Sequence, residues 1–224
     1  MRKLFLLVAM VASTVVMQAQ DLHFGVRLGG AITSFSISNE EDGALEPNGK
    51  FGFHIGGFAE YAINDQFAFA PELNIATAGA TFEKSTRDTN YGYVTTSNIK
   101  VDDKLMYINI PILAKYYVNE NLSFHFGPQL GFLMSAKYDM EYHSKIVDNN
   151  GHVVSQGSDS ESNKDAKDDV NSTDFGLSLG VGYKLENGMF FDARYYLGLS
   201  NIAKDDNTVS KNNAIQIGFG YFFN

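Results

Sequence analysis

Six charged residues stand at alternate positions of otherwise apolar or small-residue stretches, where strand formation would bury them. They comprise three cations and three carboxylates, namely Arg27, Lys115, Arg194, Glu60, Glu72 and Asp192. Charged side chains persist in a low-dielectric interior only when they are paired. The chemistry predicted for this set is therefore mutual neutralisation in a polar network filling a narrow lumen. The functional alternative is a small gated pore or proton path.

A second group has the residue types of a hydrolytic site. His143 and His152 flank Asp148, and Ser144 and Ser155 are close in the chain. A serine nucleophile needs a base and an orienting group held in fixed geometry. The surrounding segment is polar and gives no sign of such positioning. A membrane-barrel hydrolase or acyltransferase thus stays an alternative, and we expect no enzyme activity and assign no catalytic residue.

Cofactor and metal motifs are weak in this chain. The glycine-rich runs 25–30 and 176–182 lack the helix that a dinucleotide motif must open, and their even spacing is typical of strand glycines facing a lumen. The acidic, serine-rich segment 157–174 lacks the ligand spacing of an EF-hand. Its polarity predicts disorder. No cofactor and no metal are expected.

The elements that would position these residues have a period of two, which is typical of strands. The clearest runs from Leu122 to Tyr138, with apolar residues at every second position and only Leu133 out of phase. Phe190 and Tyr196 interrupt a similar pattern later in the chain. The expected strands cover residues 22–29, 51–61, 67–75, 106–116, 122–138, 175–184, 190–198 and 215–223. Pro111 and Pro128 remove ladder donors and predict a bulge or local irregularity in each of their strands.

The connections between these strands alternate between short turns and long loops. The short turns are at 63–66, 119–121 and 186–188, and the long polar loops are at about 37–50, 84–103, 143–172 and 201–211. Short turns at one end and long loops at the other are typical of outer-membrane barrels. We expect 91–102 and 145–156 to extend hairpins above the membrane. A ten-stranded barrel remains open if 91–102 pairs within it.

The apolar face of the strands is expected to contact lipid. The opposite face is mostly Gly, Ala, Ser and Asn with few, nearly balanced charges, whereas a solvated outer face would be richer in Lys and Glu. Aromatic residues also collect near strand ends, as in a membrane girdle. The rival is an exported soluble lipocalin-like barrel that binds a small apolar ligand. It would need the apolar set inside and a charged exterior.

The N-terminus predicts export. Arg2 and Lys3 precede the apolar run 4–17, and Ala19 offers a small residue for cleavage. We expect a signal peptide at 1–19 and one barrel domain at 20–224. The chain has no cysteine, so no disulfide supports it, and its net charge of −9 argues against a nucleic-acid partner.

Four segments carry a resemblance to the PorT-like outer-membrane β-barrel family. Residues 105–117 (LMYINIPILAKYY) and 126–131 (FGPQLG) resemble two of its strands, and 191–202 (FDARYYLGLSNI) and 218–222 (GFGYF) are similar to two others. The resemblance covers essentially the whole mature chain. It implies an outer-membrane barrel, usually without a known activity.

Together these patterns predict an all-β protein: an eight-stranded antiparallel up-and-down transmembrane β-barrel in the cell outer membrane, with both termini periplasmic and four outer loops. Nothing with a free strand edge is stable in hydrocarbon, so the ring must close. The expected role is structural, or docking of a partner through the outer loops, rather than passage of large solutes. Expected partners are outer-membrane lipid and an envelope or secretion-system protein.

Overall fold

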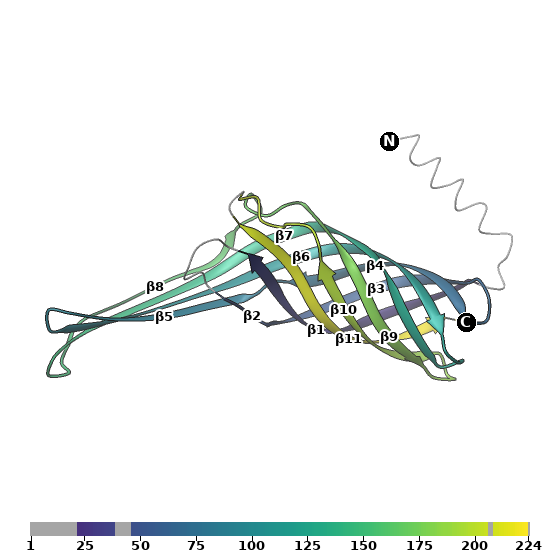
Figure 1. Ribbon diagram of the computed structural model, residues 1–224, viewed down its shortest axis with the longest axis horizontal. Helices are drawn as coiled ribbons and strands as arrows, with labels where there is room; N and C mark the ends of the chain where they lie inside the picture. Colours follow the sequence, from purple (N-terminus) through teal and green to yellow (C-terminus); the bar gives the residue numbers. More distant parts are fainter. Residues whose placement is uncertain (1–21, 39–45, 206–207, 224) are drawn as a thin grey trace.

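Eight antiparallel strands close into a ring (Figure 1). The computed structural model describes residues 22–38, 46–205 and 208–223, so the expected signal peptide lies outside the described residues. The ring strands are β1 (Leu22–Ser38), β3 (Lys50–Ala62), β4 (Phe67–Ala78), β6 (Tyr93–Tyr117), β7 (Leu122–Asp148), β9 (Thr173–Lys184), β10 (Met189–Gly198) and β11 (Val209–Phe223). Neighbours in the ring follow chain order, and β11 returns to pair with β1. The predicted eight-stranded up-and-down barrel is confirmed. Within the described part of the chain, no helix is long and apolar enough to span a membrane.

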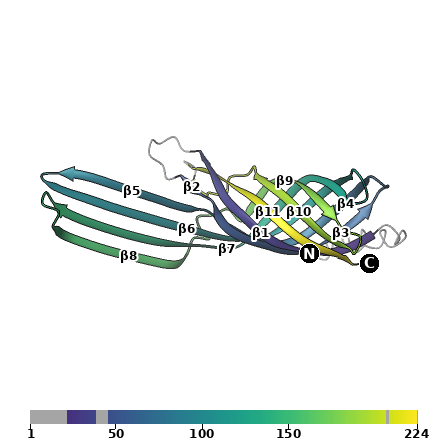
Figure 2. The ribbon, with the colours of Figure 1, turned by 90° about the horizontal axis from the view of Figure 1, so that it is seen from below.

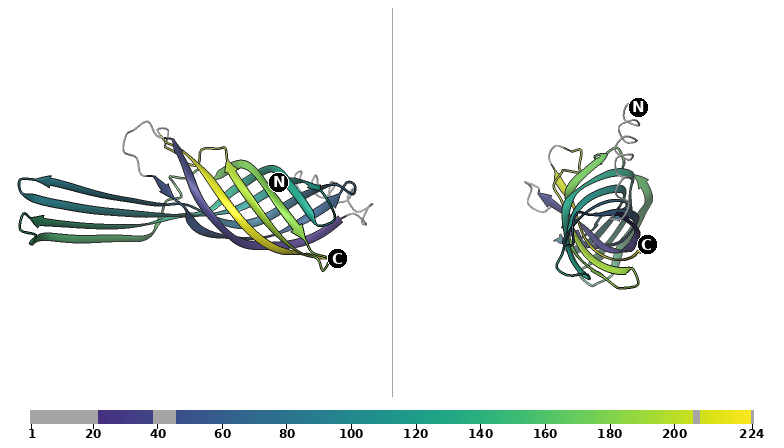
Figure 3. Two further views of the ribbon diagram at one scale, coloured as in Figure 1. Left: turned by 60° about the horizontal axis from the view of Figure 1, so that its bottom comes forward. Right: turned by 90° about the vertical axis from the view of Figure 1, so that its right-hand side faces the viewer.

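The barrel wall separates an apolar exterior from a polar interior. Along β10, Phe191 and Tyr195 are exposed, whereas Asp192 and Arg194 are buried. The other ring strands repeat this alternation, and viewed along the barrel the wall surrounds a narrow interior (Figure 3, right). The exposed apolar residues form the surface that lipid covers, as expected. Such an interior is just wide enough for side chains, which explains the many small residues on its wall.

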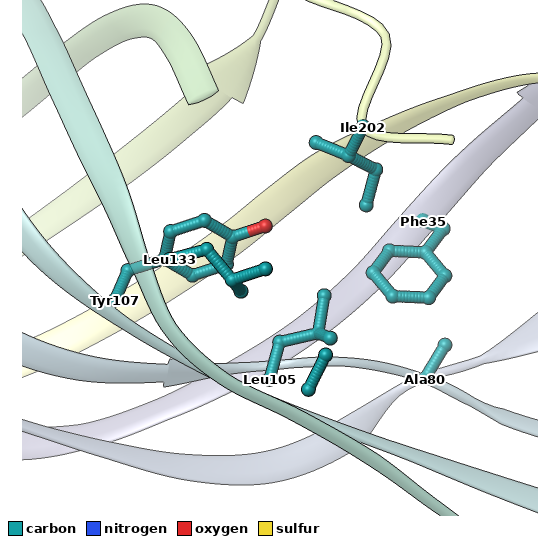
Figure 4. Close-up of a cluster of buried hydrophobic side chains, with 7 residues drawn as sticks. Phe35, Ala80, Leu105, Tyr107, Leu133 and Ile202 are labelled. Carbon is teal, nitrogen blue, oxygen red and sulfur yellow. The ribbon is translucent and has the colours of Figure 1, made fainter. Parts of the chain in front are cut away.

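Apolar side chains occupy the barrel interior at both ends. At the short-turn end, Phe58, Phe190 and Phe222 pack edge to face or tilted, with ring centroids 5.0–5.5 Å apart. At the opposite, outer end, a second cluster gathers beneath the loops (Figure 4); its members are Phe35, Ala80, Leu105, Tyr107, Leu133, Ala136 and Ile202. Leu133 and Phe190 break the sequence alternation because they point inward as part of these clusters.

A bulge in β7 reverses the two faces of that strand. Met106 of β6 pairs with Ser135, but Tyr107 pairs with Leu133, which leaves Met134 as an extra residue. Beyond the bulge Ala136 points inward and Lys137 is exposed on the exterior. The expected alternation, with Ala136 and Tyr138 toward lipid and Lys137 in the lumen, is therefore wrong above Met134. An extra residue shifts the pattern by one position.

The prolines interrupt the ladder without changing its register. Pairing between β6 and β7 stops after Pro111 and Gln129, leaves Pro128 unpaired in this ladder, and resumes at Ala114 and Phe126 in the same register. The expected local irregularity is confirmed. The register shift of this pair lies instead at Met106 and Tyr107.

A four-stranded sheet projects from the outer end of the barrel (Figure 2). We call it the outer sheet; it consists of β5 (Thr81–Asn90), residues 93–104 of β6, residues 137–148 of β7, and β8 (Val153–Asp165). The two-residue β2 (Pro47–Asn48) pairs with β5 at its base. The hairpins expected above the membrane are confirmed, so 91–102 adds no strands to the ring.

The expectation of disorder at 157–174 is wrong: its first part forms a strand, 173–174 begin β9, and the backbone N–H groups of Ala166 and Asn171 between them are hydrogen-bonded. Residues 157–165 belong to β8, which pairs along β7 from Lys137 to Val147. Low hydrophobicity predicts disorder because a chain cannot bury enough surface to offset its entropy. Here a strand already anchored in the barrel supplies hydrogen-bond partners that composition does not reveal.

Phe190 and Phe191 provide a test of the interior packing. Phe190→Ala should lower the free energy of unfolding by about 3 kcal/mol, because it removes apolar contact and leaves a cavity. Phe191→Ala, on the lipid face of the same strand, should cost less because acyl chains can fill the space. Urea unfolding in lipid vesicles measures both. Equal losses would contradict the inward packing of Phe190.

Candidate functional site

All six charged residues singled out in the sequence are buried in the barrel interior. The group nearer the short-turn end joins β3 and β6. Lys115 Nζ lies 2.6 Å from Glu60 Oε2, and the Tyr117 hydroxyl donates a hydrogen bond to Glu60 Oε1. Lys115 Nζ also lies 5.3 Å from the centre of the Phe58 ring. The pair therefore stands directly against the aromatic cluster that closes this end.

Arg27 and Asp192 form the first pair of the second group. Arg27 Nε lies 2.9 Å from both carboxylate oxygens of Asp192, and Arg27 Nη1 donates to Gln216 Oε1 at 3.2 Å. A Cβ atom at Gly218 would lie 2.4 Å from Asp192 Oδ1, so this position has no room for a side chain. The glycine-rich wall of β11 thus makes space for the pair.

Arg194 makes the most contacts of the second group. Its Nη1 and Nη2 atoms donate to Glu72 Oε2 and Oε1 at 2.7 and 2.9 Å, a bidentate arrangement. Its Nη2 atom also lies 3.7 Å from Asp192 Oδ2, which links it to Arg27. The cations and carboxylates thus alternate across the lumen, and each cation has a carboxylate within salt-bridge distance.

Two histidines lie on the interior wall near this network. Arg194 Nε donates to His125 Nε2 at 3.3 Å, so that nitrogen is the acceptor. His54 is also buried, and neither of its ring nitrogens has a hydrogen-bond partner within the described part of the chain. The free space among Arg27, Glu72, Lys115 and their neighbours is a cavity of about 20 Å³, about the space of one water molecule. The arrangement neutralises charge and fills the lumen.

The residues considered for hydrolysis lie on the outer sheet. His152 Nδ1 is 3.2 Å from Asp148 Oδ2 in an exposed turn, and the backbone N–H of His152 donates to Asp148, which lowers the pKa of that carboxyl. Ser144 follows His143 in β7, so their side chains lie on opposite faces of the sheet. The described residues show no hydrogen bond from Ser144 or Ser155 to either histidine, and no group of three or more His, Asp or Glu among them is placed to hold a metal.

A polar cluster at the outer end was missed by the sequence patterns. Asp174 is buried and accepts hydrogen bonds from Ser200 Oγ at 2.9 Å and Asn212 Nδ2 at 2.8 Å. Ser200 lies in a loop, and Asp174 comes just before the residues in which the period-two alternation of its strand was recognised. The alternation therefore could not identify either residue as facing the interior. Near this end Lys50 Nζ lies 2.7 Å from Asp102, and burial raises the pKa of the adjacent Asp103 to about 6.

Comparison with known proteins identifies a matching family and several solved structures with a similar fold. The profile of the family described as "Outer membrane protein beta-barrel domain" matches residues 18–204. No curated protein sequence matches the chain. Among solved structures, the attachment invasion locus protein Ail of Yersinia pestis is 15% identical with a TM-score of 0.41, covering 91% of this chain and 100% of its own.

Two further structures have similar scores. Neisserial surface protein A is 16% identical with a TM-score of 0.45, covering 89% of this chain and 97% of its own. OprG from Pseudomonas aeruginosa is 16% identical with a TM-score of 0.35, covering 90% and 95%. At these values the likenesses carry no argument about function.

Arg194 and Glu72 provide a double-variant test of the interior network. Arg194→Met should lower the free energy of unfolding by about 3 kcal/mol, because it leaves Glu72 charged, buried and unpaired. Adding Glu72→Met should restore most of this loss, since a buried pair can be replaced by apolar side chains at little cost. Urea unfolding in vesicles measures both.

The control is Lys164→Gln, which breaks the exposed pair with Glu161 on the outer sheet. Such a pair contributes little, so the unfolding midpoint should stay nearly unchanged. An Arg194→Met protein as stable as the parent would show that the guanidinium is not part of a buried network.

Proposed function

The chain belongs to the outer membrane protein beta-barrel domain family, and on this premise we propose that it is a closed, non-enzymatic barrel that anchors a docking sheet. The protein resides in the cell outer membrane, where its apolar exterior contacts lipid. The proposed partner is an envelope or secretion-system protein. The proposed contact surface is the outer sheet.

The observation that carries this proposal is the length of the two central strands. β6 has 25 residues and β7 has 27, whereas a tilted strand needs only about 9–11 to cross a bilayer. The remaining residues of both strands continue into the outer sheet and stay paired with each other beyond the bulge at Met134 (Figures 1 and 2). Because the same strands form the barrel wall and the outer sheet, the sheet is fixed to the barrel by hydrogen bonds rather than by a linker.

The two faces of the outer sheet differ in chemistry. On the face continuous with the barrel interior, Phe82, Val101 and Met140 lie in one cross-strand row, and Ile99 pairs with Tyr142 further out. The opposite face carries mostly charged and polar residues, including Glu83, Lys100, Glu141, His143 and Lys145. At the tip of the β5–β6 hairpin, Tyr91 is 98% exposed. Apolar and aromatic residues on an outer surface are typical of protein contact sites.

The closed interior argues against a channel. Ion pairs fill the middle of the lumen, and aromatic or aliphatic clusters occupy both of its ends. No path for a solute is evident among these side chains.

Planar-bilayer recording tests the closed barrel. The folded protein, identified by a change in gel mobility on boiling, should insert without producing steady current steps. Bilayers that receive buffer alone serve as the control. Reproducible unit conductances from the unboiled protein would contradict a filled lumen.

Photo-crosslinking tests the docking surface. A photoreactive amino acid at Ile99 on the apolar face should form one discrete protein adduct in intact envelopes. The matched control is Asn98, the preceding residue, whose side chain lies on the opposite face and should form none. Adducts at both positions, or at neither, would contradict docking through the apolar face.

A further inference from the structure

The bulge in β7 places two lysines opposite each other on the exterior. Lys104 of β6 and Lys137 of β7 are cross-strand partners at the base of the outer sheet. Like charges directly opposite in a sheet are unfavourable. Lys104 has a carboxylate partner in Asp139, but Lys137 has no ion-pair partner in the described ranges. On its other side Lys137 pairs across the ladder with Asp165 of β8, so a carboxylate stands nearby without forming an ion pair with it.

These lysines line a cavity of about 430 Å³ whose lining combines lysines with apolar side chains. Lys50 is the third cation, and it is paired with Asp102. Phe51, Phe53 and Met106 supply apolar walls. Asp102 and Asp139 neutralise Lys50 and Lys104, so Lys137 is the one lysine of the cavity without an ion pair among the described residues.

The cavity lies at the edge of the lipid-facing surface. Phe51 is 75% exposed and pairs with Ile32, the last apolar residue on the exterior of β1 before a run of serines. On β6 and β7 the apolar exterior ends at Met106 and Met134, and the next charged residues on that face are Lys104 on β6 and, beyond the bulge, Lys137 on β7. Lysines at such a boundary keep their ammonium groups in the headgroup layer while their stems lie on apolar surface.

We propose that this cavity binds a phosphate-bearing anionic lipid of the outer leaflet. The phosphate would be held by Lys104 and Lys137, with Lys50 close by, and an acyl chain would lie on Phe51, Phe53 and Met106. A phosphomonoester carries about −1.5 to −2 charge and three acceptor oxygens, which suits two opposed ammonium groups. The inference is independent of the docking proposal, because it concerns the exterior of the barrel and not the apolar face of the outer sheet.

The absence of tryptophan from the chain makes a direct test feasible. Phe51→Trp introduces a single tryptophan beside the cavity, which can be excited selectively. The variant is reconstituted in phosphatidylcholine vesicles that contain either brominated phosphatidic acid or the same fraction of brominated phosphatidylcholine. Bromine quenches tryptophan on contact, so the ratio of the two quenching curves reports lipid preference at this position. We expect stronger quenching by the phosphatidic acid.

Lysine variants in the Phe51→Trp background identify the cause of that preference. Lys137→Gln should lower it about fivefold, the factor expected for one lysine at a membrane surface. Lys104→Gln is the second variant, used if Lys137→Gln fails the gel-mobility test for folding. Lys145→Gln makes the same charge change higher on the same face of β7 and should leave the preference intact.

Three results would overturn the proposal. They are equal quenching by the two brominated lipids, an unchanged preference in the folded lysine variants, and an equal loss in Lys145→Gln. A separate arm adds inorganic phosphate to the buffer. If free phosphate abolishes the preference at unchanged ionic strength, the site recognises the ion and not the lipid, and the proposal is wrong.

Discussion

The rest of the structure depends on one constraint: inside hydrocarbon every backbone N–H and C=O must be bonded within the protein. A sheet satisfies this requirement only when it has no edge, so β1 and β11 must meet along the membrane-spanning length of the wall. Above the hydrocarbon the constraint disappears. There β8, and β5 beyond its two-residue pairing with β2, are unpaired on one side, which water permits. The change from a closed ring to an open sheet thus marks the change of solvent along β6 and β7.

Closing an eight-stranded ring creates an interior that must be filled, and this chain fills it in layers. Aromatic rings occupy the short-turn end, salt bridges the middle and an apolar cluster the outer end. The desolvation cost of these buried charges is offset because each carboxylate lies at hydrogen-bond distance from a cation. Glycines on the wall, such as Gly218, have no side chain and so leave the space that the long paired side chains occupy.

The period-two pattern predicted the strands, because lipid on one side and a narrow lumen on the other force strict alternation. The small residues and nearly balanced charges of one face, with aromatic residues near the strand ends of the other, predicted the lipid-facing side and the burial of the six charged residues. Pairing within the lumen could not be predicted. Arg194 binds Glu72 from β4 more closely than Asp192 two residues away, and this depends on the stagger of strands across the ring. The β7 bulge and the order of β8 were also missed, because both arise from a neighbouring strand and leave no local signal. Leu133 and Phe190 did carry a signal: apolar residues on the polar face indicate interior packing.

The seam between β1 and β11 joins Phe24 to Phe223, almost the two extremes of the described chain. Contacts so distant in sequence form only after a large loss of chain entropy, and folds dominated by them form slowly. A partly synthesised or truncated chain would hold two bare edges and could not persist in the bilayer. Closure of the ring therefore has to wait for the last strand of the chain, which makes it a late event in the folding of this protein.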